Sequence, residues 1–534
     1  MNLSHYNQIN LFGADIMLEG LLEESDRSYT ILREIAPLIK DTDFEDMYRE
    51  GGRPPVSPRV LLLTTIMQYL ERLPDRAAAE NLRFRLDWKI AFSLPIDFKG
   101  IHHTTLVYFR DRLLENEKAS LSFDKILEHL KKPGLVKRKM KQRIDSTHII
   151  GNVRELSRVE LLHETLRLFC NEAKHQLKNI DKKLAGYKEL YSEKISIKGI
   201  SEAQKSRFIK DAGQAMRAFI EPGRQKPFKD VQLLESYKTL VTVFEQNFED
   251  STDPDEGPKL IKIATGKDHI SSPHEPEARF SNRGKKKWLG YKAQVVETVS
   301  EEEDDVNFIT HIEVNEATDF DGDAVDGIVD ELNDKEVEPA ELYGDTHYNT
   351  GDNIRSLNKK DIDLKGPVMP VSRERKDKNK GFEIDRNEKK AICPEGVESK
   401  RFNDQRKELI SASFPEEACD KCHRREICKP EKRGKIYTTK PDDEVLNARR
   451  EEMETEEFKK DMHKRNGIEG TISGLVRGQG IRRSRYRGKT KTNLHLKLAG
   501  ATANILRLHR YRKIERKNIE RQMLEEFEKL LKAV

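Results

Sequence analysis

The sequence predicts a mixed α/β fold in which one sheet-based core carries several helical additions. Three observations lead to this prediction. Strand signals rich in β-branched and aromatic residues recur between Gln142 and Val371. A stretch of helical periodicity interrupts them between residues 155 and 250, and helical patterns dominate before residue 130 and after residue 441. This order of elements is typical of a mixed sheet with helical insertions.

Length and composition exclude several protein classes. The 534 residues suggest about three or four domains at the usual domain size. Apolar and charged residues each make up 36%, and no stretch is apolar enough to cross a membrane. The N-terminus lacks the basic and apolar pattern of a secretory signal. We therefore expect a cytoplasmic protein with no membrane partner.

Residues 1–130 are expected to form a helical N-terminal domain. Ser57-Pro58 has the N-cap and first-position order of a helix start, after a turn at Gly51–Pro55. Asp75 can cap a second helix, Arg76–Arg85, and a third follows His103. These short helices with tight breaks could form a helix-turn-helix-like DNA-binding module or a generic bundle.

The central part alternates strands and helices. Residues 136–150 are expected to contain the first strand of the core, at Gln142–Ile150. Residues 151–258 are expected to form a helical insertion that ends in a Pro/Gly-containing linker. Residues 259–372 return to the sheet. Their predicted elements are a hairpin of Trp288–Thr298 with Asn307–Val314, a helix at Asp321–Leu332, and strands at Glu341–Asp345 and Leu364–Val371.

The C-terminal third begins with a charged, irregular insertion, residues 373–440, that contains four of the five cysteines. Residues 441–510 are expected to be helical and to include a basic region. Residues 511–534 form an amphipathic helix that could contact a second copy of the chain or pack on its own domain.

The net charge of +4 indicates no partner by itself, but its distribution does. Lys131–Arg143 and Arg477–Lys497 are rich in Lys and Arg and contain no acidic residue. Two such stretches in a nearly neutral chain favour contact with a polyanion at several places. The alternative is solvated helix faces.

Three carboxylates stand out by context. Asp145 lies within the first predicted strand, Asp345 ends a later strand, and Glu469 precedes the densest basic stretch. Carboxylates from a sheet end and an adjacent helix can hold two divalent ions for phosphodiester chemistry. With 94 acidic residues in the chain, spacing alone has low specificity.

The blocks around these residues resemble DDE transposases of bacterial insertion sequences, most of all the group numbered eleven-eighty-two. The resemblance rests on blocks in family order, with the N-terminal residues from Gly52 to Leu106 ahead of them: Arg143-Ile144-Asp145-Ser146-Thr147-His148, Trp288-Leu289-Gly290-Tyr291-Lys292, Leu342-Tyr343-Gly344-Asp345-Thr346-His347-Tyr348 and Gly467-Ile468-Glu469-Gly470-Thr471. It covers most of residues 50–510.

The resemblance implies an RNase H-like core in which Asp145, Asp345 and Glu469 bind Mg²⁺ or Mn²⁺. The implied activity is cleavage at transposon ends and 3′-OH transfer into target DNA, with double-stranded DNA as partner and a homodimer as the working form. The alternative is an inactive or domesticated DNA-binding protein derived from a transposase. Arg465 matches the arginine of a related Tyr-Arg-Glu-Lys signature, but Met462 and Val476 replace its tyrosine and lysine.

Most of the residues expected to contact DNA phosphates follow Glu469, and one precedes it by a helical turn. They are Arg465, Arg477, Arg482, Arg483, Arg485, Tyr486, Arg487 and Lys489. His148 and His347 follow the two aspartates and could orient water or simply be structural. Trp288 could pack in the core or stack on a base.

The cysteines offer a second kind of metal site. Cys419-x2-Cys422, Cys428 and the upstream Cys393 could bind structural Zn²⁺, with His423 as an alternative ligand. The alternative is free surface thiols or a packed loop. Cys170 lies in a helical pattern and is expected to be a core residue.

Overall fold

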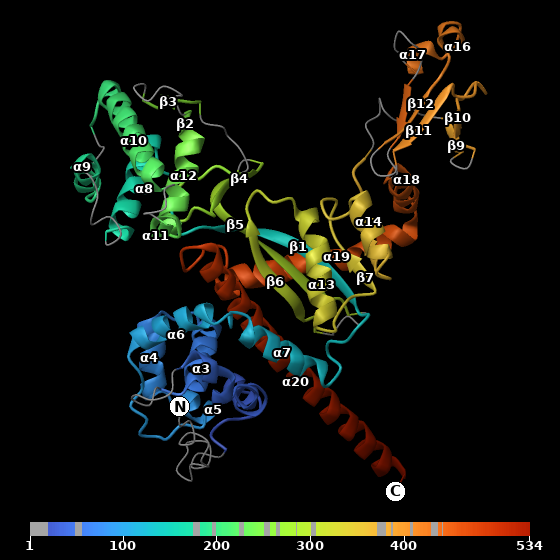
Figure 1. Ribbon diagram of the computed structural model, residues 1–534. Helices are drawn as coiled ribbons and strands as arrows, with labels where there is room; N and C mark the ends of the chain where they lie inside the picture. The colour runs from blue at the N-terminus through green and yellow to red at the C-terminus, as the bar shows by residue number, and fades with distance from the viewer. Residues whose placement is uncertain are drawn as a thin grey trace.

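The computed structural model describes residues 20–48, 56–174, 182–194, 199–223, 229–249, 257–262, 268–284, 286–300, 306–370, 381–385, 388–405, 409–428, 436–439 and 442–533. A mixed sheet lies at the centre of the molecule (Figure 1). A helical N-terminal part, a helical insertion and a smaller β-rich part surround it. The predicted mixed α/β class is confirmed.

The central sheet has six strands. They are β1 (Lys141–Ile150), β4 (Arg279–Arg283), β5 (Lys286–Thr298), β6 (Ile309–Glu316), β7 (Glu341–Tyr343) and β8 (Asp363–Lys365). β5 pairs antiparallel with β1, β4 and β6, so the predicted hairpin is confirmed. β7 runs parallel to both β1 and β8. The strand predicted at Gln142–Ile150 is therefore the centre of the sheet.

Helices follow and separate these strands. They are η6 (Asp321–Ala324) with α13 (Val325–Asp334), as predicted, and α14 (Gly351–Asn358). The strand predicted at Leu364–Val371 is wrong for residues 366–370, because β8 ends at Lys365, and Val371 lies outside the described residues. Pro367 and Pro370 explain the early end, because proline has no backbone N–H to donate to a neighbouring strand.

The N-terminal part is helical, as predicted. Its elements are α2 (Arg27–Thr30), η2 (Ile31–Ile35), η3 (Ala36–Leu38), η4 (Asp41–Met47), α3 (Pro58–Leu70), α4 (Asp75–Phe84), α5 (Leu86–Ala91), α6 (His103–Glu115) and α7 (Leu121–Lys131). Ser57 caps α3 by accepting a hydrogen bond from the Val60 N–H. These helices and the sheet share one continuous apolar core. The predicted turn at Gly51–Pro55 lies outside the described residues.

The helical insertion has an apolar core of its own. Its helices are α8 (Arg158–Glu172), α9 (Lys182–Leu190), α10 (Glu202–Gly223), α11 (Lys229–Gln232) and α12 (Glu235–Asn247), followed by the short strands β2 (Phe248–Glu249) and β3 (Lys259–Leu260). Ser157 and Glu160 form a capping box that fixes the start of α8. Cys170 is buried in this core, as expected. Most of the predicted linker, residues 250–256, lies outside the described residues.

The segment predicted to be irregular, residues 373–440, contains regular elements. They are β9 (Glu383–Asp385), β10 (Lys390–Ile392), β11 (Arg401–Gln405), β12 (Leu409–Ser413), α16 (Glu416–Asp420), α17 (Arg425–Cys428) and β13 (Ile436–Thr439). The prediction of irregular structure was wrong because these strands are short and carry many charged or polar residues. Such strands give no clear apolar period in the sequence.

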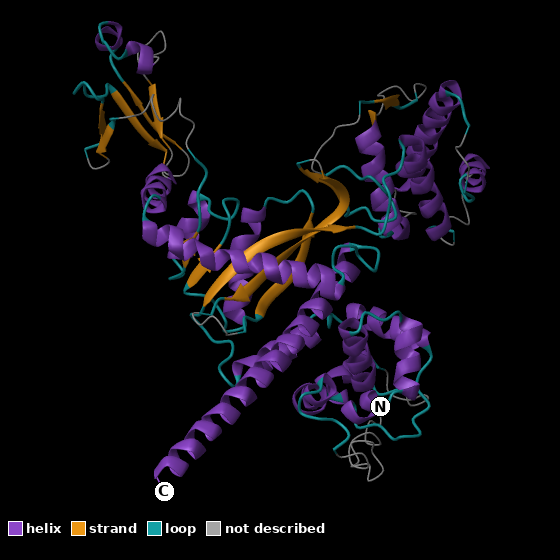
Figure 2. Ribbon diagram, turned by 180° about the vertical axis from the view of Figure 1, so that it is seen from behind, coloured by secondary structure: helices purple, strands orange, loops and turns teal. Residues whose placement is uncertain are grey.

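Three helices complete the chain: α18 (Asp442–Met453), α19 (Glu456–Gly474), which continues into η7 (Leu475–Gln479), and α20 (Lys489–Ala533). α19 packs along β1 and crosses the sheet (Figure 2). α20 packs on β6, α7 and α3 and then projects beyond them (Figure 1). Its Asn504 side chain bonds both the N–H and the C=O of Ile309, so it satisfies the backbone at the edge of β6.

Among the helices in the described ranges, none has both the length and the apolar character that a membrane-spanning helix requires.

Candidate active site

Two of the predicted site residues lie at the ends of neighbouring parallel strands. The last paired residues of β1 and β7 are Arg143 and Tyr343. Asp145 and Asp345 each lie two residues further along. In parallel strands, residues at matching positions point to the same face of the sheet. The fold therefore brings two aspartates together that are far apart in the sequence.

Each aspartate is oriented by a local backbone hydrogen bond. Asp145 Oδ1 accepts from the Ser146 N–H at 2.7 Å, and Asp345 Oδ1 accepts from the His347 N–H at 2.8 Å. The His347 imidazole lies 3.5 Å from Asp345 Oδ2 and is half exposed. These contacts leave both side chains partly accessible to solvent, at 13% for Asp145 and 21% for Asp345.

Tyr348 lies close enough to both aspartates and to a third carboxylate, Asp321, to be affected by their charges. Burial and the neighbouring charges of Asp321, Asp145 and Asp345 raise the pKa of Tyr348 well above its ordinary value. Its hydroxyl therefore stays protonated and donates to Gln294 Oε1. Sequence reasoning missed both Asp321 and Tyr348 as site neighbours.

Asp321 is held in place by three polar partners, which come from β1 and β5. Its Oδ1 accepts from Lys292 Nζ at 3.1 Å and Gln294 Nε2 at 3.0 Å, and its Oδ2 accepts from Ser146 Oγ at 3.1 Å. Because these donors satisfy the carboxylate, Asp321 acts as a structural neighbour of the site.

The third predicted carboxylate, Glu469, lies on α19 and is exposed. Arg465 precedes it by four residues, so both lie on the same side of the helix. Arg465 Nη2 is 3.7 Å from Asp145 Oδ2. Glu469 therefore lies one helical turn after Arg465, the residue of α19 that contacts Asp145.

A buried ion network holds α19 against the sheet. Glu297, on β5, is fully buried and pairs with Arg143 of β1 at 2.6 Å. Arg143 Nη1 also donates to the carbonyl of Lys464 in α19, at 2.7 Å. A Cβ at Gly467 would come within 2.0 Å of the same Arg143 nitrogen, so α19 can approach this closely only with glycine there. This close approach sets the position of Glu469.

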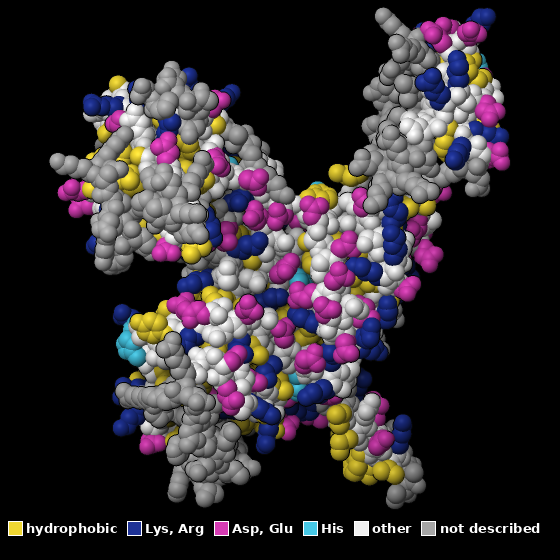
Figure 3. All heavy atoms as spheres, viewed as in Figure 1, with side chains coloured by type: hydrophobic (Ala, Val, Ile, Leu, Met, Phe, Trp, Pro, Cys, Tyr) yellow, Lys and Arg dark blue, Asp and Glu magenta, His cyan; other side chains and the backbone are white. Residues whose placement is uncertain are grey.

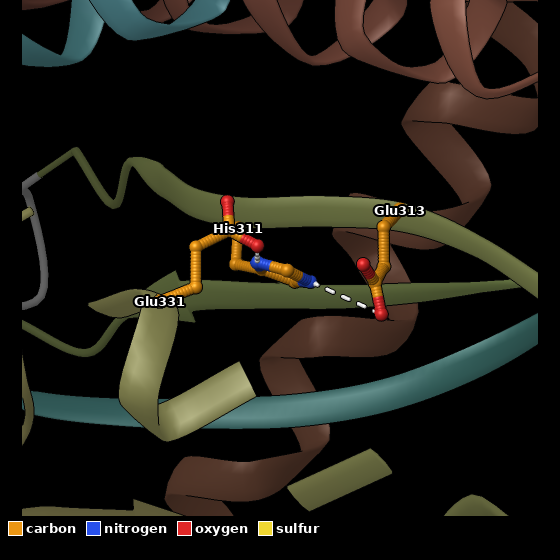
Figure 4. Close-up of side chains that lie close together, drawn as sticks. All are labelled: His311, Glu313 and Glu331. Carbon is orange, nitrogen blue, oxygen red and sulfur yellow. Dashed lines mark ion pairs between the residues drawn. The ribbon is translucent and has the colours of Figure 1, made fainter. Parts of the chain in front are cut away.

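The three predicted carboxylates do not converge tightly. Among the described residues, a different group has potential metal ligands close together. The ligand atoms of His311, Glu313 and Glu331 lie within 4.8 Å of one another. Figure 4 shows the His311 imidazole between the two glutamates. Its Nδ1 lies 3.1 Å from Glu331 Oε2, and its Nε2 lies 3.9 Å from Glu313 Oε1.

This group fits an ion-pair network better than a cation site. The two imidazole nitrogens face different carboxylates, so one ion could not use both. Lys335 and Lys497 contact Glu331 Oε1 at 2.6 and 3.5 Å. Their positive charges would repel a metal cation, and they lower the pKa of Glu331 together with His311, against the opposing effect of burial.

The strand register also separates this group from the aspartates. His311 pairs with Val296, which pairs with Ile144, the residue before Asp145. Since successive residues of a strand point to opposite faces, His311 and Asp145 lie on opposite faces of the sheet.

The predicted basic residues divide into buried or packed side chains and exposed ones. Arg482 donates to the carbonyl of His148, and burial lowers its pKa. Arg485 lies over the Tyr69 ring and donates to the Leu73 carbonyl. Tyr486 bonds the Tyr69 hydroxyl at 3.2 Å. The Lys489 N–H donates to Glu277. Arg477, Arg483 and Arg487 are exposed, and Arg485 is also exposed although it packs on Tyr69.

A cavity of about 660 Å³ opens at the end of β1. Arg483 and Arg487 line it together with Arg154, Lys194, Glu160 and Glu164, and Arg154 pairs with Glu160 at 2.6 Å. Two of the arginines predicted to contact phosphate therefore line the same cavity as the residues that follow Ile150. His495, on α20, is buried among Tyr69, Tyr486 and Arg485, and burial lowers its pKa to about 4.

The remaining candidate side chains have structural surroundings. The His148 and Trp288 rings lie 4.9 Å apart, and Trp288 is buried. The four C-terminal cysteines form no disulfide and line one cavity of about 180 Å³.

Comparison with known families gave two matches. Residues 392–509 match the family described as "Transposase DDE domain", and residues 18–112 match "Transposase domain (DUF772)". The first match includes Glu469 and the basic stretch, but neither includes Asp145 or Asp345. No curated protein and no solved structure was found to match the chain.

Proposed function

Since this chain is a DDE transposase of an insertion sequence, we propose that it cleaves phosphodiester bonds at transposon ends and joins the freed 3′-OH ends to target DNA. One observation carries this proposal. Asp145 and Asp345 each follow by two residues the last pair between the parallel strands β1 and β7, and α19 packs on β1 with Arg465 in contact with Asp145 and Glu469 one turn further. We take this sheet to be the RNase H-like core that the resemblance implies.

The side chains of Asp145, Asp345 and Glu469 fit Mg²⁺ or Mn²⁺ as donors. All three offer carboxylate oxygens, which hard divalent cations prefer, and partial exposure leaves room for the waters that Mg²⁺ keeps. When bound, such cations supply the Lewis acidity that lowers the pKa of water and stabilises the leaving oxygen of a phosphodiester. Arg465 offsets part of the negative charge that these carboxylates bring together.

Three exposed arginines are the best candidates for contact with DNA phosphates. Arg477, Arg483 and Arg487 project from the segment after α19, and two of them line the cavity at the end of β1. Such contacts position the duplex and supply affinity, but they carry no base specificity. Arg482, Arg485 and Tyr486 instead hold this segment against β1 and the N-terminal helices. We expect the protein to act on DNA in the bacterial cytoplasm.

We assign dimerisation to the projecting end of α20. Its apolar residues recur on one side of the helix and are between 52% and 67% exposed: Ile519, Met523, Leu524, Phe527, Leu530 and Leu531. Figure 3 shows an apolar surface along this end of the molecule. A second copy of the same helix offers a matching apolar stripe, as in a coiled coil.

The double substitution Leu524→Asp and Phe527→Asp is expected to convert a dimer into a monomer, because it places charges inside the helix pair. Light scattering during size-exclusion chromatography measures the mass. The control is Lys529→Glu, which lies on the polar side of the helix and should leave the dimer intact. A monomeric wild-type chain would contradict the assignment.

Cleavage itself can be measured with supercoiled and linear DNA that carries the terminal repeats flanking the gene. We expect cutting at the repeat ends with Mg²⁺ or Mn²⁺, and binding without cutting in EDTA. Equal cutting in EDTA would refute the metal-dependent mechanism. Binding without cutting under every divalent condition would favour the alternative, a non-catalytic DNA-binding protein derived from a transposase.

A further inference from the structure

Among the residues whose burial is described between β9 and β13, the apolar core is small. Its buried apolar residues are Ala391, Ala412 and Phe414, with Phe382, Ile384 and Phe402 partly buried against them. So few buried side chains supply little hydrophobic stabilisation. Small units of this kind usually need a metal or a disulfide to stay folded. The four cysteines nearby form no disulfide.

All four cysteines line the same cavity, although they come from two separate turns and a short helix. Cys393 begins a Cys-Pro-Glu-Gly turn in which the Gly396 N–H donates to the Cys393 carbonyl at 2.8 Å. Gly396 has a φ of +73°, which favours glycine there. Cys419 and Cys422 flank a second turn, in which the Cys422 N–H donates to the Cys419 carbonyl. Cys428 ends the short helix α17.

The charges around this cavity suit a group of thiolates. Lys421, Arg424 and Arg425 also line it, and among the described residues one carboxylate, Glu395, lines it with them. A Zn²⁺ ion with four thiolate ligands carries a net charge of about −2, and nearby cations offset such a charge. Arg425 in addition pairs with Asp420, which orients it beside Cys419.

His423 is a weaker candidate than Cys428 for the fourth ligand. Its side chain is 77% exposed, and its Nε2 lies 3.5 Å from Glu395 Oε1 at the surface. Cys428 is only partly exposed. Cys170 differs from all four, because burial raises the pKa of its thiol to about 12 and keeps it protonated.

We propose that Cys393, Cys419, Cys422 and Cys428 bind one structural Zn²⁺ ion that holds the β-rich part together. Among the described side chains no three of these sulfurs lie within 4.8 Å of one another. Tetrahedral bonds of about 2.3 Å place thiolate sulfurs about 3.8 Å apart, so binding draws the two turns and the end of α17 together. This proposal does not depend on the catalytic activity of the chain.

The test measures metal content in the full-length chain, purified under reducing conditions without chelator or affinity metal. Elemental analysis should find about one zinc per chain in the wild type, and Co²⁺ exchanged into the site should give the intense absorption of tetrahedral thiolate coordination. The double variant Cys419→Ser/Cys422→Ser should lose both signals. Cys170→Ala is the matched control, since it removes a thiol outside the site, and it should keep them.

Two further measurements assign the ligands and exclude the alternatives. His423→Ala should retain zinc, and a loss of zinc in that variant would overturn the four-cysteine ligand set. Thiol titration should find the four cysteines reduced but protected until a chelator is added. A wild-type chain that contains no zinc, takes up no Co²⁺ and shows freely reactive thiols or a disulfide would refute the proposal. Limited proteolysis should cut residues 393–428 faster after zinc is removed.

Discussion

Replacing Asp145 with Asn is expected to lower DNA cleavage by about 10³-fold or more, since metal-ion stabilisation of the reacting phosphate is worth several kcal/mol. The substitution keeps the size of the side chain and its hydrogen bond from the Ser146 N–H, but it removes the charge. DNA affinity should change little, because the exposed arginines remain in place. Cleavage is measured on labelled terminal-repeat DNA, and affinity is measured by fluorescence anisotropy.

The matched control for this variant is Asp352→Asn. Asp352 lies in the first turn of α14, a few residues beyond Asp345, and its side chain is 81% exposed beside Arg355. It should cut DNA like the wild type. If Asp145→Asn keeps more than about a tenth of the wild-type activity, a loss of under 1.4 kcal/mol, Asp145 is not a metal ligand. If both variants lose activity, the effect is one of folding.

The sequence could predict the strands that carry the two aspartates, because their residues have clear strand character. It could not predict that Asp321 and both aspartates lie close to Tyr348. Asp321 begins a helix that any sequence reading would assign, yet its function depends on contacts with Lys292 and Ser146 of two other strands. Such contacts arise only when the sheet is assembled, and a single sequence contains no local signal for them.

The basic stretch after Glu469 shows a similar limit. Its charge density marks the stretch as a candidate DNA contact, but charge alone cannot distinguish an arginine that packs on a ring from one that faces a cavity. Arg485 stacks on Tyr69, more than 400 residues away in the sequence, whereas Arg483 faces a cavity. Side chains that hold the segment in place and side chains free to meet phosphate therefore look alike in the sequence.

Glu297 was not recognised as important from the sequence, because it precedes an acidic run, Glu301–Asp305, that resembles a solvated turn. In the structure it is fully buried between two arginines. Its Oε1 accepts from Arg143, while its Oε2 accepts from Arg507 of α20 at 3.0 Å and from the Thr471 hydroxyl of α19. One carboxylate thus joins β1, β5, α19 and α20.

Replacing Glu297 with Gln is expected to lower the free energy of unfolding by about 3–5 kcal/mol, because it leaves two buried guanidinium groups without a counter-charge. The volume and part of the hydrogen bonding remain, so the loss reports the charge itself. Denaturant unfolding followed by tryptophan fluorescence measures it, since Trp288 lies on the same strand. Glu456→Gln, an exposed residue on α19, is the control and should unfold like the wild type.

The same substitution should affect activity through the position of α19. Arg143 holds both Glu297 and the Lys464 carbonyl, so a displaced Arg143 shifts the helix turn that leads to Glu469. A misplacement of about 1 Å in such a site costs about 10²-fold in rate. We therefore expect Glu297→Gln to slow cleavage at temperatures where the variant is still folded, and to raise hydrogen exchange in α19 before it does so in β1. Unchanged exchange and activity in a destabilised variant would show that α19 is held by its apolar contacts, with the buried charges serving the core alone.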